Sequence, residues 1–321
     1  MTRSRFRDEV ESAYLAGLID GEGCFMLTGN SMSPVFSLAM SMKTGDLLPA
    51  LARRWGGSVT IKRQATDRHA GMFDWHNSGV GLLPLLNSVR PHVRLKLRQV
   101  ELLVESCAVR KAVWSGRRWN VRYKFTDAQR ERLFEIRQEC SEANRKGPDG
   151  PAMALDAVAS TRLFDDLWTV NDRAYLGGLI DGEGCLMIDK DLFKATLWLA
   201  MTVKADPLLK HLHRSWGGTL KHIDRNVPGW SRSTAWVVRH DALRSLLPAV
   251  IPHLRLKRAQ ADLLIKSLTL KQDRVRWTNQ QRRELQHEYR YAVMALNRKG
   301  PSVPYGATTL VVGVQSEVRY G

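Results

Sequence analysis

The sequence predicts an α+β protein that contains two copies of one folding unit, each with the element order α-β-β-α-β-β-α. The prediction begins with a repeat: YLAGLIDGEGC at Tyr14 returns as YLGGLIDGEGC at Tyr175, an offset of 161 residues. Further landmarks recur at the same offset, which chance does not explain. These landmarks are Lys43 with Lys204, the WGG at Trp55 and Trp216, Pro91-His92 with Pro252-His253, and the RLK at Arg94 and Arg255.

The order of elements follows from the periodicity of apolar residues within the first copy. Apolar positions at helical spacing predict a helix over residues 8–20, ended by Gly21 and Gly23. Alternating residues and glycine stops predict strands at 24–29, 35–42, 58–65 and 72–77 around a helix at 46–54, followed by helices at 79–90 and 95–110. The second copy repeats this order.

The domain boundaries follow from the repeat and from the residues between its copies. Both copies close on NRKGP, at Asn144 and Asn297. We expect a first unit at 1–147, a linker at 148–170 that proline and glycine interrupt, and a second unit with a C-terminal tail at 171–321. The offset falls to 152 late in the unit, because the first copy carries a basic, tryptophan-containing insertion at 111–122.

Composition indicates a folded protein with a polyanionic partner. The 321 residues are 44% hydrophobic, enough for buried cores, and the formal net charge is +17. No apolar run approaches the ~20 residues that span a bilayer, and the N-terminal residues lack the apolar core of a signal peptide. None of the four cysteines forms a CxxC pair, which argues against zinc. We expect a reducing, cytoplasmic location, in a bacterial or phage-like context rather than an organelle.

Each repeated helix combines small residues with an acidic end. Gly17 lies inside the first apolar helix and Gly178 inside its copy, and small residues let two helix backbones approach closely. Side by side, the two helices would bring their acidic ends and their partly negative C-terminal carbonyls to one place. Such an arrangement requires cations, and oxygen ligands suit Mg²⁺.

The two acids at each helix end receive different interpretations. Asp20 and Asp181 still belong to the last helical turn, so we interpret them as local hydrogen-bonding groups. Glu22 and Glu183 lie just beyond that turn, and we interpret them as metal ligands.

The two segments resemble the signature of LAGLIDADG homing endonucleases of the monomeric, two-repeat type, and the resemblance covers nearly the whole chain. It implies a saddle of antiparallel sheets over DNA, with the motif helices packed at the domain interface. In that family the acid before the last motif glycine binds the divalent metal, here Glu22 and Glu183. The residue before it supplies a backbone carbonyl, here Gly21 and Gly182.

The activity that the resemblance implies is metal-dependent, site-specific cleavage of both strands of duplex DNA, connected with the mobility of an intron or intein. The expected cofactor is Mg²⁺, with Mn²⁺ able to substitute and Ca²⁺ able to bind without supporting cleavage. No protein partner and no membrane are expected. A bound metal activates water and stabilises charge on the phosphate, so no side-chain nucleophile is needed.

The resemblance also gives roles to two pairs of lysines. The family places a lysine in the context of Lys96 and Lys257 near the active-site water network, where it could polarise water; the alternative is a solvated charge at a helix N-terminus. Lys43 and Lys204 are interpreted as phosphate contacts. The polar residue that often precedes them in the family is apolar in both copies, Met42 and Val203, so we expect slow turnover or a different water network.

Alternation along the strands predicts which side chains read DNA. Residues 24, 26, 28 and 30 share a face with Glu22, whereas Val59 and Ile61 are expected to point to the core. A two-stranded ribbon of this kind fits the major groove, although a merely solvated sheet face would be equally polar. Because the copies differ, the target should be asymmetric. The predicted contacts, besides Lys43 and Lys204, are Thr28, Asn30, Thr60, Lys62, Gln64, Asp189, Lys221 and Arg225.

Two other functions are compatible with the same scaffold. An intron RNA maturase would use the basic surface for RNA, and a DNA-binding regulator would bind without cutting. Neither function needs both Glu22 and Glu183, and a regulator usually adds a helix-turn-helix domain that the sequence does not show. Duplex DNA is therefore the expected partner, with intron RNA as a second one.

Overall fold

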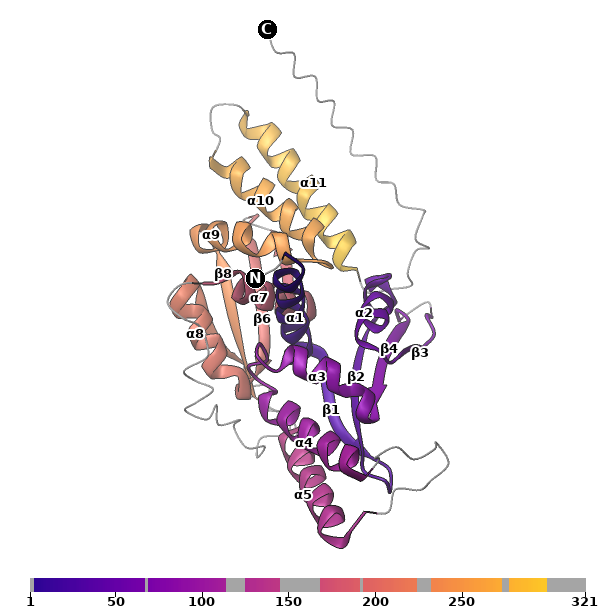
Figure 1. The fold of residues 1–321 in the computed structure, drawn as a ribbon. Coiled ribbons are helices and arrows are strands. Elements are labelled where there is room, and N and C mark those ends of the chain that lie inside the picture. Colours follow the sequence, from indigo (N-terminus) through magenta and orange to yellow (C-terminus); the bar gives the residue numbers. More distant parts are fainter. Residues whose placement is uncertain are drawn as a thin grey trace.

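The computed structural model describes residues 3–66, 69–113, 125–144, 168–190, 193–223, 232–272 and 277–298. The first unit contains nine main elements in the order helix, two strands, helix, two strands and three helices (Figure 1). They are α1 (Arg3–Glu22), β1 (Gly23–Thr28), β2 (Ser33–Ser41), α2 (Leu47–Trp55), β3 (Ser58–Arg63), β4 (Met72–Ser78), α3 (Leu83–Val89), α4 (Leu97–Val113) and α5 (Asp127–Asn144).

The second unit repeats this order. Its elements are α7 (Val170–Glu183), β5 (Gly184–Ile188), β6 (Ala195–Thr202), α8 (Asp206–Trp216), β7 (Thr219–Ile223), β8 (Ser233–Arg239), α9 (His240–Val250), α10 (Arg258–Gln272) and α11 (Asn279–Asn297). Short 3₁₀ turns at Met42–Thr44, Gly79–Leu82, Val203–Ala205 and Ile251–His253 join some of them. The predicted α+β class and the α-β-β-α-β-β-α order are confirmed.

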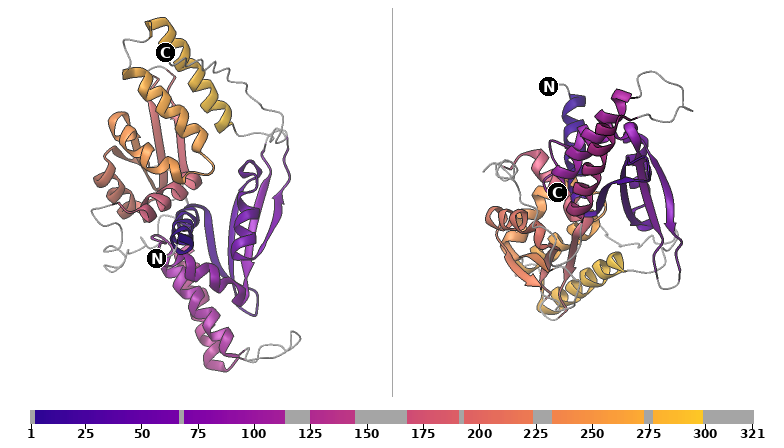
Figure 2. Two further views of the ribbon diagram at one scale, coloured as in Figure 1. Left: turned by 45° about the horizontal axis from the view of Figure 1, so that its top comes forward. Right: turned by 90° about the horizontal axis from the view of Figure 1, so that it is seen from below.

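Each unit contains one four-stranded antiparallel sheet. The strand orders are β1-β2-β4-β3 and β5-β6-β8-β7, and the registers correspond: Cys24 pairs with Ser37, and Cys185 pairs with Trp198. The two sheets lie on opposite sides of α1 and α7 (Figure 2). Since the sheets differ in sequence but share one register, each strand position in one unit has a defined counterpart in the other.

The WGG landmark connects the end of a helix to the sheet. In the first unit the buried indole of Trp75 donates to the carbonyl of Gly56 at 3.0 Å, and in the second Trp236 donates to Gly217 at 2.8 Å. The next glycine, Gly57, has a φ of 89°, and a Cβ there would overlap the β4 backbone. The two glycines therefore allow the chain to turn directly from helix to strand.

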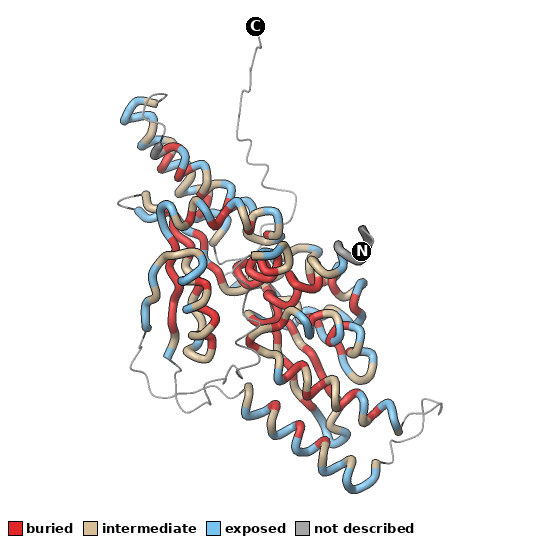
Figure 3. Tube along the Cα trace, turned by 60° about the vertical axis from the view of Figure 1, so that its left-hand side comes forward, coloured by how far each residue is buried: buried red, intermediate tan, exposed pale blue. Residues whose placement is uncertain are grey.

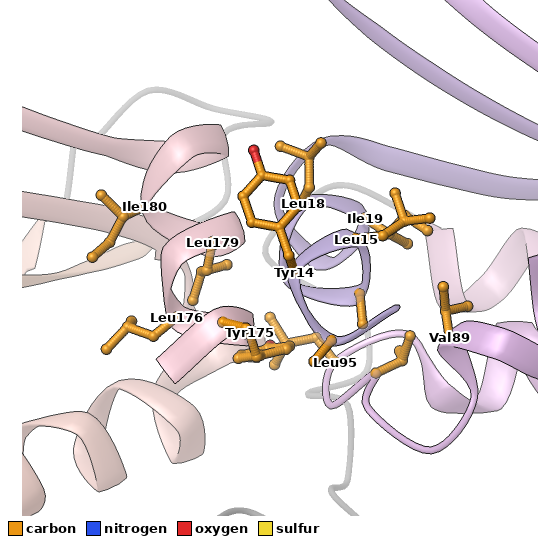
Figure 4. Close-up of a cluster of buried hydrophobic side chains, with 14 of the residues drawn as sticks. Tyr14, Leu15, Leu18, Ile19, Val89, Leu95, Tyr175, Leu176, Leu179 and Ile180 are labelled. Atoms are coloured by element: carbon orange, nitrogen blue, oxygen red, sulfur yellow. The ribbon is translucent and has the colours of Figure 1, made fainter. Parts of the chain in front are cut away.

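The interface between the units consists of the two motif helices. Tyr14 and Leu18 of α1 lie on the side that faces Tyr175 and Leu179 of α7, and all four are buried (Figure 4). The buried segments continue from this helix pair into both sheets (Figure 3). One hydrophobic core therefore spans both units, because each unit buries its motif helix against the other.

The last helices of both units begin at capping boxes and end on an edge strand. Thr126 and Thr278 each accept from the backbone of a glutamine three residues on, whose side chain accepts in return. At the other end, the amides of Asn144 and Asn297 donate to Phe25 and Leu186, both at 2.6 Å. The asparagine of NRKGP therefore ties α5 to β1 and α11 to β5.

Several predicted details differ from the structure. Helix α1 continues through Gly21 to Glu22, and strand β1 begins at Gly23. Ile61 is predicted to point to the core, but it is 50% exposed, because β3 is an edge strand that leaves this side chain partly uncovered. Gln64 lies beyond the end of β3. Most of the predicted linker and insertion, the C-terminal tail and Arg225 lie outside the described residues.

A search of the described helices for a membrane span found none that is long and apolar enough to cross a bilayer.

Gly17→Ala should destabilise the protein, because a Cβ at this position would overlap the backbone carbonyl of Tyr175. We expect a loss of about 3 kcal/mol in the free energy of unfolding, since two packed helices must separate. Urea unfolding measures the loss. The control is Gly81→Ala, where nothing lies within 4 Å of the added carbon. Equal stability of the two variants would contradict the close helix approach.

Candidate active site at the ends of the motif helices

The motif aspartates join three segments. Asp20 accepts from the backbone nitrogens of Arg94, Leu95 and Lys96 at 2.8–3.0 Å, and also from the hydroxyl of Tyr175 in the other unit at 2.7 Å. Asp181 accepts in the same way from the backbone of 255–257 and, at 2.8 Å, from the Tyr14 hydroxyl. The hydrogen bonds extend across the interface, so each aspartate also holds the RLK segment of its own unit beside the opposite helix.

Two arginines add further contacts across the interface. The guanidinium of Arg94 lies over the ring of Tyr175, with 4.9 Å to the ring centroid, and pairs with Asp172 at 2.5 Å. Arg255 lies over Tyr14 at 4.3 Å and pairs with Glu11 at 3.1 Å. Each RLK arginine thus binds the other unit's motif helix.

The RLK lysines bind the C-terminal ends of the motif helices. Lys96 Nζ donates to the carbonyls of Ile19, Asp20 and Gly23 at 2.8, 3.0 and 2.7 Å. An ammonium group has three hydrogens, so these acceptors use all of them. The positive charge lies where the helix dipole and the unpaired carbonyls are negative. Burial lowers the pKa of Lys96, while the nearby carboxylates oppose that shift.

Lys257 occupies the equivalent place in the second unit. Its Nζ donates to the carbonyls of Ile180 and Asp181 at 2.8 and 2.7 Å, and more weakly to Gly182 at 3.3 Å. Burial also lowers the pKa of Lys257. Both lysines therefore act first on the helix ends, and no side-chain pattern in the sequence indicates these backbone acceptors.

The two motif glutamates converge where α1 and α7 end. A Cβ at Gly21 would lie 3.0 Å from Cγ of Glu183, and a Cβ at Gly182 would lie 3.4 Å from Cγ of Glu22. Each glutamate therefore lies against the glycine of the opposite helix. Glu22 is exposed and Glu183 is half-buried, so both carboxylates remain open to ligands from solvent. A Cβ at Gly21 would crowd the Glu183 side chain, whereas one at Gly182 would be in ordinary contact with Glu22.

The electrostatics of this pair favour a bound cation. Burial raises the pKa of Glu183 to about 7, and the charge of Glu22 adds to the rise, whereas Lys96 and Lys257 oppose it. Partial desolvation at the helix end also raises the pKa of Glu22, and the charges of Lys257 and Lys96 oppose this rise. The two lysines donate their hydrogens to backbone carbonyls and leave part of the carboxylates' negative charge uncompensated. A hard divalent cation would neutralise that charge. Two carboxylates with nearby backbone carbonyls are the oxygen ligands that such a cation prefers.

The described residues contain no group of three His, Cys, Asp or Glu side chains that could hold a metal. The candidate ligands are thus the two glutamates and the carbonyls of Gly21 and Gly182, of which the second also accepts from Lys257. A site with only two side-chain ligands fits a metal that completes its shell with water and phosphate oxygens, as Mg²⁺ does.

The structure divides the predicted DNA contacts into three groups. Exposed positions on or just beyond the open sheet faces include Thr28, Asn30, Thr60, Lys62, Asp189 and Lys221. Gln64 is exposed beyond β3, and Arg225 lies outside the described residues. Lys43 and Lys204 instead contact the ends of the other unit's last helix, where they donate to the carbonyls of Arg298 and Ala143, the second at 3.2 Å.

Sequence reasoning missed the tyrosines and the polar residues of β2 and β4. Tyr14 and Tyr175 open the two motif copies, so their recurrence at the 161 offset could have identified them. Ser37 and Asp74 carry no such signal, because the second unit has Trp198 and Ala235 at these places.

No family model and no curated protein sequence matches the chain. Solved structures do match: I-AabMI bound to uncleaved DNA has a TM-score of 0.62 at 16% identity, covering 87% of this chain and 98% of that one. I-GzeII in complex with its DNA target gives 0.60 at 13%, covering 87% and 96%, and I-SmaMI bound to cleaved DNA gives 0.58 at 15%, covering 89% and 95%.

The chain has the LAGLIDADG homing endonuclease fold. The coverage includes both units, so the structural likeness confirms the two-repeat LAGLIDADG architecture that the sequence motifs indicated. At this level of identity the likeness shows the fold, while the chemistry depends on the residues of this chain.

Glu183→Gln should stabilise the metal-free protein at high pH. The folded-state pKa of about 7 lies above the ordinary glutamate value of 4.5, so the folded protein retains a proton between these values, and rising pH destabilises it. Glutamine avoids this loss. We expect the variant to be more stable at pH 8 by on the order of 1–2 kcal/mol, allowing for solvent screening, and the difference to disappear as the pH falls toward 4.5.

Urea unfolding with a chelator present measures this difference. Glu131→Gln, an equal change of charge on the exposed face of α5, separates the local effect from the general effect of removing one negative charge. If the stability difference between the variant and the wild type stays constant from pH 5 to 8, the pKa of Glu183 is not raised in the folded protein.

Proposed function

We propose that the chain is a site-specific DNA endonuclease that uses a divalent metal to cleave both strands of a long, asymmetric duplex site. The convergence of Glu22 and Glu183, one from each unit, carries this proposal. A net charge of +17 and the DNA complexes of proteins with the same fold support it. The alternatives of an RNA maturase or a regulator require neither glutamate.

Glu22 and Glu183, with the carbonyls of Gly21 and Gly182, would hold Mg²⁺ or Mn²⁺. Once bound, the metal supplies a more acidic water and stabilises charge on the phosphate and the leaving oxygen. We expect Ca²⁺ to support binding without cleavage; one solved structure contains I-SmaMI bound to an uncleaved DNA target in the presence of calcium ions. Since both acids come from one chain, no protein partner is required.

Lys96 and Lys257 serve as positioning residues in this proposal. Their ammonium groups neutralise the helix ends and oppose the rise in the pKa of both glutamates, which favours the charged carboxylates that bind a metal. Because carbonyls already accept all three Lys96 hydrogens, its effect on water would be indirect. The aspartates and tyrosines keep the lysines in place by fixing the RLK segments.

DNA would lie across the open faces of the two sheets. Thr28, Asn30, Thr60, Lys62 and Gln64 would contact one half-site, and Asp189, Lys221 and Arg225 the other. Lys43 and Lys204 would bind phosphates after leaving the helix-end carbonyls that they contact in the free protein. Action on DNA fits a cytoplasmic location.

Glu22→Gln or Glu183→Gln should abolish double-strand cleavage and leave DNA binding largely intact, because each change removes one metal ligand but no DNA contact. The substrate is a duplex selected by cleavage from a randomised library with Mg²⁺, and binding is measured in Ca²⁺. Glu131→Gln, remote from the helix ends, should cleave normally. Cleavage at the wild-type rate by either site variant would remove that glutamate from the active site.

Lys257→Met should shift the pH dependence of single-turnover cleavage to higher pH and change affinity little. Lys257 is the larger of the two lysine effects that lower the pKa of Glu22, so its removal leaves that carboxyl protonated over more of the pH range. The exposed Lys210→Met on α8 is the control. An unchanged pH profile with weaker binding and a salt slope smaller by about one would make Lys257 a phosphate contact instead.

A further inference from the structure

At one corresponding cross-strand pair, the open faces of the two sheets carry opposite charges on neighbouring strands. In the first unit the face opposite the core contains Ser37 on β2, Asp74 on β4 and Thr60 on β3, and Thr60 pairs directly with Asp74. At the 161 offset the second unit has Trp198, Ala235 and Lys221, and Lys221 pairs directly with Ala235. An acid on one face thus corresponds to a cation on the other, shifted by a single strand.

Asp74 is an oriented acceptor on an otherwise basic protein. The Ser37 hydroxyl donates to its Oδ1 at 2.7 Å, which fixes the carboxylate on the sheet surface. The residues on either side along β4 alternate normally: Trp75 is buried in the core and Asp74 points the other way. A carboxylate on a face that binds DNA repels phosphates, so its favourable contact with a duplex must be a hydrogen-bond donor on a base.

Lys221 is an oriented donor on the second face. Its Nζ lies 5.6 Å from the ring centroid of Trp198, a cation–π distance, and the side chain is exposed. Ala235 is fully buried on the same face, which leaves room for the large side chain of Trp198 diagonally across the strands. The tryptophan supports the lysine much as Ser37 supports Asp74, with the opposite charge presented to the ligand.

Asp74 and Lys221 suit different bases in the major groove. In the major groove cytosine presents an amino donor without a neighbouring acceptor, whereas adenine places the N7 acceptor beside its amino group and would repel a carboxylate. Guanine presents two acceptors, O6 and N7, that match an ammonium group. Neighbouring strands lie about 4.8 Å apart, so Asp74 and Lys221 reach equivalent distances from the centre of the site to within one or two base pairs.

We propose that Asp74 reads a cytosine amino group in one half-site and that Lys221 reads a guanine at the corresponding place in the other. This inference rests on the proposed function, that is, on duplex DNA as the ligand. A C·G pair presents the cytosine amino group on one strand and the guanine acceptors on the other, so the two units would read the same kind of base pair through different bases.

The test is selection by binding from a randomised duplex library in Ca²⁺, so that cleavage is not required. Asp74→Asn keeps the shape and the contact with Ser37, and its amide matches the N6 and N7 of adenine. We expect it to change one base preference from cytosine to adenine by about 10-fold or more. Lys221→Met should abolish one guanine preference and leave the other positions unchanged.

Matched controls separate base reading from charge. Asp46→Asn on the exposed start of α2 makes the same change of charge as Asp74→Asn, and Lys210→Met matches Lys221→Met. Both controls should retain the wild-type base preferences.

Two results would overturn the proposal. If Asp74→Asn leaves every base preference as in the wild type, or if Lys221→Met weakens binding to all sequences equally, these residues do not read bases. If the wild-type protein selects no duplex at all, the proposed function itself fails, and the two failures are therefore distinguishable.

Discussion

Helices α1 and α7 approach so closely at Gly17 and Gly178 that no side chain fits between their backbones. This contact holds the two helices side by side with their C-terminal ends together, and these ends carry Glu22 and Glu183. The same approach lets each tyrosine reach the aspartate of the opposite helix, at 2.8 Å for Tyr14 and 2.7 Å for Tyr175. The close helix contact therefore determines both the packing and the candidate site. A looser interface would move the two carboxylates apart and open the hydrophobic core that both units share.

Close packing of the helix ends creates an electrostatic problem that the chain solves only in part. Two C-terminal dipole ends and two glutamates meet in a small volume, and the pKa of Glu183 rises to about 7. Lys96 and Lys257 neutralise the carbonyls, which use up their hydrogens. The negative charge of the two glutamates therefore remains. Their carboxylates are accessible from solvent, and this charge suits a divalent cation that also binds a phosphate.

Much of the architecture could be predicted from the sequence because the chain contains two copies of the same pattern. A repeat with five landmarks at one offset fixes the element order, and helices ending in Glu22 and Glu183 identify the candidate site. Ile61 was placed wrongly in the core because alternation predicts which face a side chain shares but not how well that face is covered, and β3 is an edge strand. The acceptors of Lys96 are backbone atoms distant in sequence, which no side-chain pattern encodes.

The repeat does not predict where the two units differ in function, because comparing the copies identifies only the residues that match. Asp74 opposite Ala235 is the clearest example, and it indicates that the two halves share a frame but not a ligand surface. The account depends on one chain forming one complete site. A titration of a selected duplex with increasing protein tests this directly, with the duplex held at a concentration far above the dissociation constant. The measured quantity is the fraction of duplex cut in both strands in a single turnover. Cleavage should saturate at one chain per duplex; saturation at two would contradict the account.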